Sequence, residues 1–193
     1  MLDFFEDYEK ELFATMNALD KIKINDLYLL MNQAYENGKK IYILGNGGSA
    51  STASHWICDF GKGINTPKSK RMKMISLVDN VAILTALGND VSYDDTFSEQ
   101  LKNFLEEGDL VISLSVSGNS LNLVAAHKYA KSVGAHAVAI IGDYDGLLNE
   151  YSDSVLLISS KNYGIVEDIH LILNHIISQY MTHKNKLSEQ VSV

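Results

Sequence analysis

The feature of this sequence that most constrains its fold is a regular alternation of short apolar runs with longer helical patterns. Most of the runs are almost continuously apolar, as strands covered on both faces are. They lie at 41–44, 74–77, 110–116, 137–141 and 155–158. Helical patterns follow them at roughly 47–60, 80–88, 94–106, 119–133 and 163–181. This order predicts a doubly wound, five-stranded parallel sheet between two helical layers, with right-handed crossovers.

Two further helices are expected before the first strand. Apolar residues recur there at near-helical spacing, at Phe5, Leu12, Met16 and Leu19 and then at Leu27, Leu30, Met31 and Ala34. The 193 residues, 46% of them apolar, suffice for one compact domain. We therefore expect a single α/β domain over 1–193, a three-layer αβα sandwich with N-terminal helices at 1–38 and a polar, frayed tail at 184–193.

Composition argues against several classes of partner. The formal net charge is −8, and the local cluster of basic residues at 68–73 is too short to follow a nucleic-acid backbone. No apolar run reaches the ~18 residues that cross a bilayer. Cys58 is the sole cysteine, so no intrachain disulfide can form, and the amino terminus lacks the basic-then-apolar order of a secretory signal. We expect a soluble cytoplasmic protein without nucleic-acid or membrane partners.

A glycine-rich run follows the first expected strand and leads straight into a helix. It reads Gly45, Asn46, Gly47, Gly48 and Ser49. Ligands bind at the carboxyl ends of strands in such sheets, and glycines let backbone amides approach an anion at a helix amino terminus. A plain strand-to-helix turn is an equally good interpretation of this run taken alone.

The third strand ends in a second unusual run, which reads Ser115, Val116, Ser117, Gly118, Asn119 and Ser120. Three hydroxyls and an amide there can surround a phosphate with neutral donors, which suits a phosphate ester that must also be released. Serine and asparagine can also act as helix caps, but one hydroxyl suffices for a cap. Neither run has the lysine of a nucleotide-hydrolysing P-loop or the dinucleotide pattern G-x-G-x-x-G.

Four titratable side chains fall on two of the expected helices. His55 and Asp59 are four residues apart and share a helix face, and Glu167 and His175 are two turns apart on the last helix. An aldose–ketose isomerisation needs a base to move a proton between adjacent carbons and an acid to serve the oxygens. The same side chains can bind a divalent metal such as zinc. For either pair alone, solvated helix charges are the simpler interpretation.

The motifs together have a recognisable order. GNGGS precedes a helix that carries a histidine, GND follows at 88–90, then the S-x-SGNS run, and the closing helix reads E-D-I-H-x-x-x-N-H. This order resembles the bacterial phosphoheptose isomerases of the sugar isomerase (SIS) domain family and covers nearly the whole chain. The resemblance implies an α/β SIS fold and binding of a sugar phosphate.

The resemblance also implies roles for particular residues. The substrate-binding set would be Asn46, Gly47, Gly48, Ser49, Asn89, Asp90, Ser115, Ser117, Asn119, Ser120 and Glu167, with the four serines around the phosphate. Asp59 matches the catalytic base and His175 the catalytic acid. The zinc ligands would be His55, Asp59, Glu167 and His175. The family implies homotetramers whose active sites lie at subunit interfaces.

The implied reaction converts sedoheptulose 7-phosphate to D-glycero-D-manno-heptose 7-phosphate, for heptose in lipopolysaccharide or capsule. Several positions depart from the family pattern. Asp59 is one methylene shorter than the usual glutamate, Glu167 replaces the usual glutamine, and Val116, Gly63 and Gly164 stand where a threonine, an arginine and an aspartate are expected. An isomerase of another sugar phosphate therefore stays open. So does a non-catalytic SIS protein of the replication-initiator-associated type, although the retained acid and base groups favour an enzyme.

Overall fold

The computed structural model describes residues 1–67 and 69–191. Among these residues, five parallel strands form one sheet in the order β2-β1-β3-β4-β5. The strands are β1 (Lys40–Gly45), β2 (Lys73–Ser76), β3 (Leu110–Ser115), β4 (His136–Gly142) and β5 (Ser154–Ile158). The predicted doubly wound sheet is confirmed, and each strand lies within one residue of its expected bounds. The order reverses between β1 and β3, where a sheet of this kind binds ligands.

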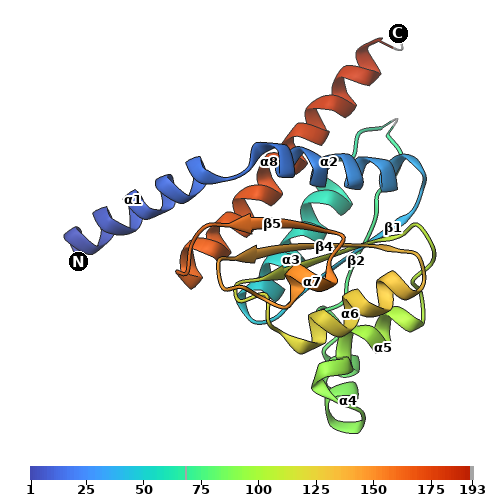
Figure 1. Ribbon diagram of the computed structural model, residues 1–193. Helices are drawn as coiled ribbons and strands as arrows, with labels where there is room; N and C mark the ends of the chain where they lie inside the picture. The colour runs from blue at the N-terminus through green and yellow to red at the C-terminus, as the bar shows by residue number, and fades with distance from the viewer. Residues whose placement is uncertain (68, 192–193) are drawn as a thin grey trace.

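Helices cover both faces of the sheet (Figure 1). The side chains of β1 alternate between two apolar cores. Ile41 and Ile43 join the core beneath one helical layer, and Tyr42 and Leu44 join the core beneath the other. The first layer is formed by α2 (Lys21–Glu36), α3 (Gly48–Cys58) and α8 (Tyr163–Val191). The second is formed by α5 (Thr96–Lys102) and α6 (Leu121–Ser132).

Three helices lie at the periphery of these layers. They are α1 (Leu2–Ala18), α4 (Val81–Asp90) and the short α7 (Leu148–Tyr151). Figure 1 shows α1 as an arm that leaves the body of the molecule, while α4 projects from another side. The arm is held to α8 because the Tyr8 hydroxyl donates to Asp168 over 2.6 Å. This hydrogen bond raises the pKa of Tyr8 to about 12.

The expected frayed tail is instead a continuation of α8, which runs to Val191. No glycine or proline follows Gly164, and lysine, leucine and glutamate favour the helical state. Lys184 donates to the Tyr28 hydroxyl over 2.8 Å, and Asn185 to the carbonyl of Ile64 over 3.0 Å. Residues 192–193 lie outside the described residues.

The structure bears on two expectations from the sequence, one about the basic cluster at 68–73 and one about membrane-spanning helices. Lys68 of the basic cluster lies outside the described residues, but Lys70 pairs with Glu36 over 2.8 Å and Lys73 donates to the carbonyl of Gly38. These lysines therefore hold neighbouring backbone and side chains. In the described part of the chain, no helix has the length and apolar character needed to cross a bilayer.

Candidate functional site

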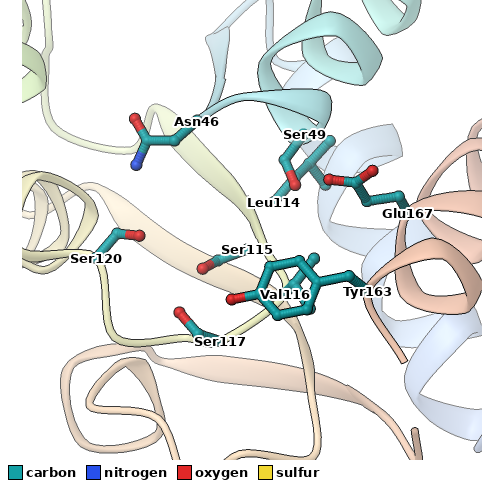
Figure 2. Close-up of a pocket in the computed structure, with 9 residues that line it drawn as sticks. All are labelled: Asn46, Ser49, Leu114, Ser115, Val116, Ser117, Ser120, Tyr163 and Glu167. Atoms are coloured by element: carbon teal, nitrogen blue, oxygen red, sulfur yellow. The ribbon is translucent and has the colours of Figure 1, made fainter. Parts of the chain in front are cut away.

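The two motif-bearing loops line one pocket, because β1 and β3 are neighbours and Gly45 pairs with Leu114 at their carboxyl ends (Figure 2). This pocket, which we call the serine pocket, has a volume of about 350 Å³, including some space that is open to solvent. Its lining residues are Asn46, Ser49, Leu114, Ser115, Val116, Ser117, Ser120, Tyr163 and Glu167. The structure thus brings together the serines of both loops, as the sequence predicts.

The hydroxyls of the β3 loop are arranged to donate hydrogen bonds. Ser120 is the N-cap residue of α6, yet its side chain makes no capping bond. The Ser115 and Ser117 oxygens accept backbone N–H groups at 3.0 and 3.2 Å, which fixes each oxygen and leaves its hydrogen free to donate. Helix capping is therefore not the reason for three serines here. Three free hydroxyls around one pocket can donate to a bound anion, although Glu167 also lines that pocket.

The Asn46 side chain is held in place by its neighbours. Its amide nitrogen donates to Asn122 over 2.9 Å, and its amide oxygen accepts from Asn122 at 3.0 Å and from the Tyr93 hydroxyl at 3.0 Å. Asn122 itself is 1% exposed. These bonds leave one amide hydrogen of Asn46 for a ligand.

The last helix closes the pocket with two side chains from its first turns. The Tyr163 ring extends across the pocket toward Ser115 and Ser117 (Figure 2). The Glu167 carboxylate lies against Gly48, so a Cβ at Gly48 would collide with it. A side chain at Gly48 would therefore displace the Glu167 carboxylate from its present position.

Three of the four predicted metal ligands cluster at the other end of α3. His55 Nε2 and His175 Nε2 are 3.2 Å apart, and Asp59 Oδ2 lies 3.4 Å from the first and 3.7 Å from the second. The cluster opens on a second pocket, lined by Asp59, Gly63, His175, Ser178, Gln179 and Thr182. Two histidines and a carboxylate can hold a metal ion. Glu167 instead lines the serine pocket.

The helix that carries His55 changes type at Asp59. The expected helix over 47–60 ends as an α-helix at Cys58, and a π-helical turn, η1 (Asp59–Gly63), begins at Asp59. Asp59 then accepts a hydrogen bond of 2.6 Å from the buried amide of Asn174 on α8. Short π-helical turns occur frequently at functional sites.

Five predicted substrate-binding residues are not among those that line the serine pocket: Gly47, Gly48, Asn89, Asp90 and Asn119. Asn89 and Asp90 bond to each other at the end of α4, outside the lining of the serine pocket in the described part of this chain. Asn119 bonds to the Ser117 carbonyl and the Leu147 amide, which anchors the segment before α7. The roles of Asn89 and Asp90 stay predictions, and the Asn119 side chain serves the protein's own backbone.

Four polar residues around the site were not predicted: Tyr93, Asn122, Tyr163 and Asn174. Asn174 sits inside the quoted E-D-I-H-x-x-x-N-H run, so its position next to His175 was a usable signal. Tyr93 and Asn122 had none, because their partner Asn46 is 47 and 76 residues away. Tyr163 had none either, since the serines that its ring faces belong to a loop far away in the sequence.

Comparison with known proteins agrees with this geometry. Residues 4–142 match the SIS domain family. The chain is 32% identical to a phosphoheptose isomerase of Clostridium acetobutylicum, over 95% of this chain and 96% of the relative. The chain belongs to the phosphoheptose isomerases of the SIS domain family. A Synechocystis relative of the same name is 35% identical over 85% of this chain and 83% of its own length.

Two solved structures extend the likeness to three dimensions. A phosphoheptose isomerase from Francisella tularensis superposes with a TM-score of 0.84 at 26% identity, covering 94% of this chain and 95% of the other. Phosphoheptose isomerase GmhA from Neisseria gonorrhoeae gives the same TM-score and identity, covering 93% and 95%. The SIS fold expected from the sequence is thus confirmed.

Proposed function

We propose that this SIS-family chain is a phosphosugar aldose–ketose isomerase that converts sedoheptulose 7-phosphate to D-glycero-D-manno-heptose 7-phosphate. The observation that carries the proposal is a division of the site into two parts, each of which includes residues of α3 and α8. A pocket of neutral hydroxyl donors lies at one end, and a cluster of two imidazoles and a carboxylate lies at the other. The names of the relatives supply the sugar, and the geometry supplies the chemistry.

The spacing of the two parts suits a seven-carbon sugar phosphate. Glu167 in the serine pocket and His175 in the cluster are separated along α8 by about 12 Å, from the rise of a helix. An extended heptose 7-phosphate measures roughly 10 Å from its phosphorus to C1, judged from ordinary bond lengths. With the phosphate among the serines, C1 and C2 would therefore lie near Asp59 and His175.

Each part then has a defined task. Ser49, Ser115, Ser117 and Ser120 donate to the phosphate, and the amino terminus of α6 adds a favourable dipole. Asp59 removes a proton from C1 of the ketose while His175 protonates the C2 oxygen, which gives the enediol. Asp59 returns a proton to C2, the hydroxyl proton on C1 passes to His175, and the C1 carbonyl of the aldose forms.

The cluster also fits a zinc ion. Ligands bound at about 2.0–2.1 Å in a tetrahedron lie about 3.3–3.4 Å from one another. The three separations among His55, Asp59 and His175 are 3.2, 3.4 and 3.7 Å. These three residues would hold the ion, and a ligand role for Glu167, which lines the serine pocket, stays a prediction. When bound, zinc would polarise the oxygens on C1 and C2 as a Lewis acid.

We further propose that the chain forms a homotetramer. Phe4, Phe5 and Phe13 on the α1 arm are 70%, 63% and 58% exposed, and no residue of α4 is buried. A second subunit would cover these apolar surfaces and bring Asn89 and Asp90 to a neighbouring site. The cytoplasmic location and a role in lipopolysaccharide or capsule synthesis stay predictions.

Incubation of the purified protein with sedoheptulose 7-phosphate, followed by NMR of the sugar carbons, tests the proposed reaction. We expect the aldose 7-phosphate to accumulate to a fixed ratio, faster after zinc is added to metal-stripped protein. No conversion with or without zinc would contradict the proposal and favour a non-catalytic SIS protein. Conversion of a shorter ketose phosphate alone would keep the chemistry and change the substrate.

A further inference from the structure

Asn174 is a buried polar residue that the proposed reaction does not use. It precedes His175 on α8 and is 0% exposed. Its amide nitrogen donates to Asp59 Oδ2 over 2.6 Å, a bond that joins two segments 115 residues apart. A short bond from a buried amide to a carboxylate is a strong restraint on both side chains.

The bond acts on the oxygen that faces the cluster. Asp59 Oδ2 lies 3.4 Å from His55 Nε2 and 3.7 Å from His175 Nε2. A carboxylate oxygen offers two lone pairs, and Asn174 occupies one of them. The other then points toward the imidazoles, and the carboxylate plane can no longer rotate freely.

The orientation of the Asn174 amide shows which of its contacts matters. Its oxygen, Oδ1, is buried without a hydrogen-bond partner among the described residues. A rotated amide would place this oxygen against the Asp59 carboxylate, where two acceptors repel, so the carboxylate fixes the orientation. A buried acceptor without a partner destabilises a fold. Packing alone would therefore be served better by leucine at this position.

We infer that Asn174 is a positioning residue that holds the Asp59 carboxylate toward His55 and His175. Asp59 is one methylene shorter than glutamate, so its reach depends on the direction of the side chain. Asn174 supplies that direction from the opposite helix. This inference rests on the role of Asp59 in the proposed function.

The direct test is Asn174→Leu, which removes the donor and the unpaired oxygen while keeping similar volume. We expect kcat to fall roughly 10- to 100-fold, the usual effect of losing such a partner, with KM for the ketose phosphate within about twofold. The melting temperature should be unchanged or higher. The matched control is Asn185→Leu, which removes a similar amide bond on α8, to the Ile64 carbonyl, and should leave kcat unchanged.

Zinc affinity, measured by competition with a chelator, supplies a readout that is independent of turnover. Asn174→Leu should weaken zinc binding roughly 10- to 100-fold in the parent and have no further effect in an Asp59→Asn background. An equal loss in both backgrounds, or parent-like kcat and zinc affinity, would overturn the inference. If the parent fails to isomerise the ketose, the proposed function fails. The zinc affinities of Asn174→Leu in the two backgrounds still decide the role of Asn174. If the leucine variant does not fold, Asn174→Ala takes its place in both measurements.

Discussion

The serines of the β3 loop carry the most direct residue-level prediction. Because the Ser117 and Ser120 hydrogens are free to donate, the double change to alanine should remove two hydrogen bonds to phosphate. Each is worth about 1.5–3 kcal/mol to a charged group. We therefore expect at least a hundredfold rise in Kd for the sugar phosphate by calorimetry, with an unchanged melting temperature.

Ser132→Ala is the matched control for this prediction. Ser132 lies at the other end of α6 and donates to the Tyr129 carbonyl at 2.7 Å, away from the pocket. Its loss should leave Kd at the parent value. Parent-like binding by the double variant would place the phosphate elsewhere in the molecule.

The length of Asp59 is a second residue-scale prediction. Its carboxylate already lies 2.6 Å from Asn174 and within 3.7 Å of both imidazoles, so an added methylene has no room in the same direction. Asp59→Glu should therefore lower kcat, since a misplacement near 1 Å costs on the order of a hundredfold. Steady-state kinetics checks this, and a faster enzyme would mean that the native aspartate is a compromised base.

What the sequence could predict at this scale was residue type and motif, not orientation. The serines of the two loops line one pocket, as predicted. Separately, His55, Asp59 and His175 form one cluster, as predicted. Glu167 shares a helix with His175, but its carboxylate lies beside Gly48 and lines the serine pocket. Such choices depend on contacts between segments more than a hundred residues apart, which a local pattern does not contain.

At the scale of elements, apolar runs located the strands well, because buried parallel strands have a simple composition. Helix ends were harder. The pattern over 47–60 cannot distinguish an α-helical turn from the π-helical turn at η1, since both keep apolar residues on one face. The four-residue α7 is too short for any periodicity.

Two buried histidines tie helices to strands, and they predict a pH-dependent stability. His127 of α6 lies 2.7 Å from Ser113 of β3, and His170 of α8 lies 3.1 Å from the Ile140 carbonyl of β4. Burial lowers the pKa of His127 to about 3 and that of His170 to about 4. Both are therefore neutral in the folded protein, whereas in the unfolded chain they bind protons near pH 6.5.

The direction of the pH dependence follows from the number of protons that each state binds. Below pH 6.5 the unfolded state binds more protons than the folded state. The free energy of unfolding is therefore fully retained above that pH and falls as the pH drops toward about 4 for His170 and about 3 for His127. Each histidine contributes a slope of up to about 1.4 kcal/mol per pH unit. Chemical denaturation at pH 7.5 and 5 should show this loss, and His127→Gln should make it shallower. The control is His136→Gln, at an exposed histidine of β4, which should leave the pH dependence of stability unchanged. An unaltered slope in His127→Gln would contradict the claim that the buried His127 causes the loss.

At the scale of the whole molecule, the projecting arm carries the prediction about assembly. Light scattering should give a mass about four times the 21.4 kDa of one chain. Phe5→Glu with Phe13→Glu should reduce that mass, because a charge on each exposed aromatic opposes burial. The control is Glu9→Gln on the same helix. A parent protein that is monomeric at micromolar concentration would contradict the proposed tetramer.

The central claim is that Asp59 moves a proton between carbons of a ketose phosphate bound by the serine pocket. The measurement that tests it most directly is NMR of sedoheptulose 7-phosphate incubated with the parent and with Asp59→Asn, each shown to be folded. We predict aldose 7-phosphate with the parent and none with Asp59→Asn, because an amide cannot accept the proton. Equal rates of conversion by the two proteins, or no conversion by either, would contradict this account.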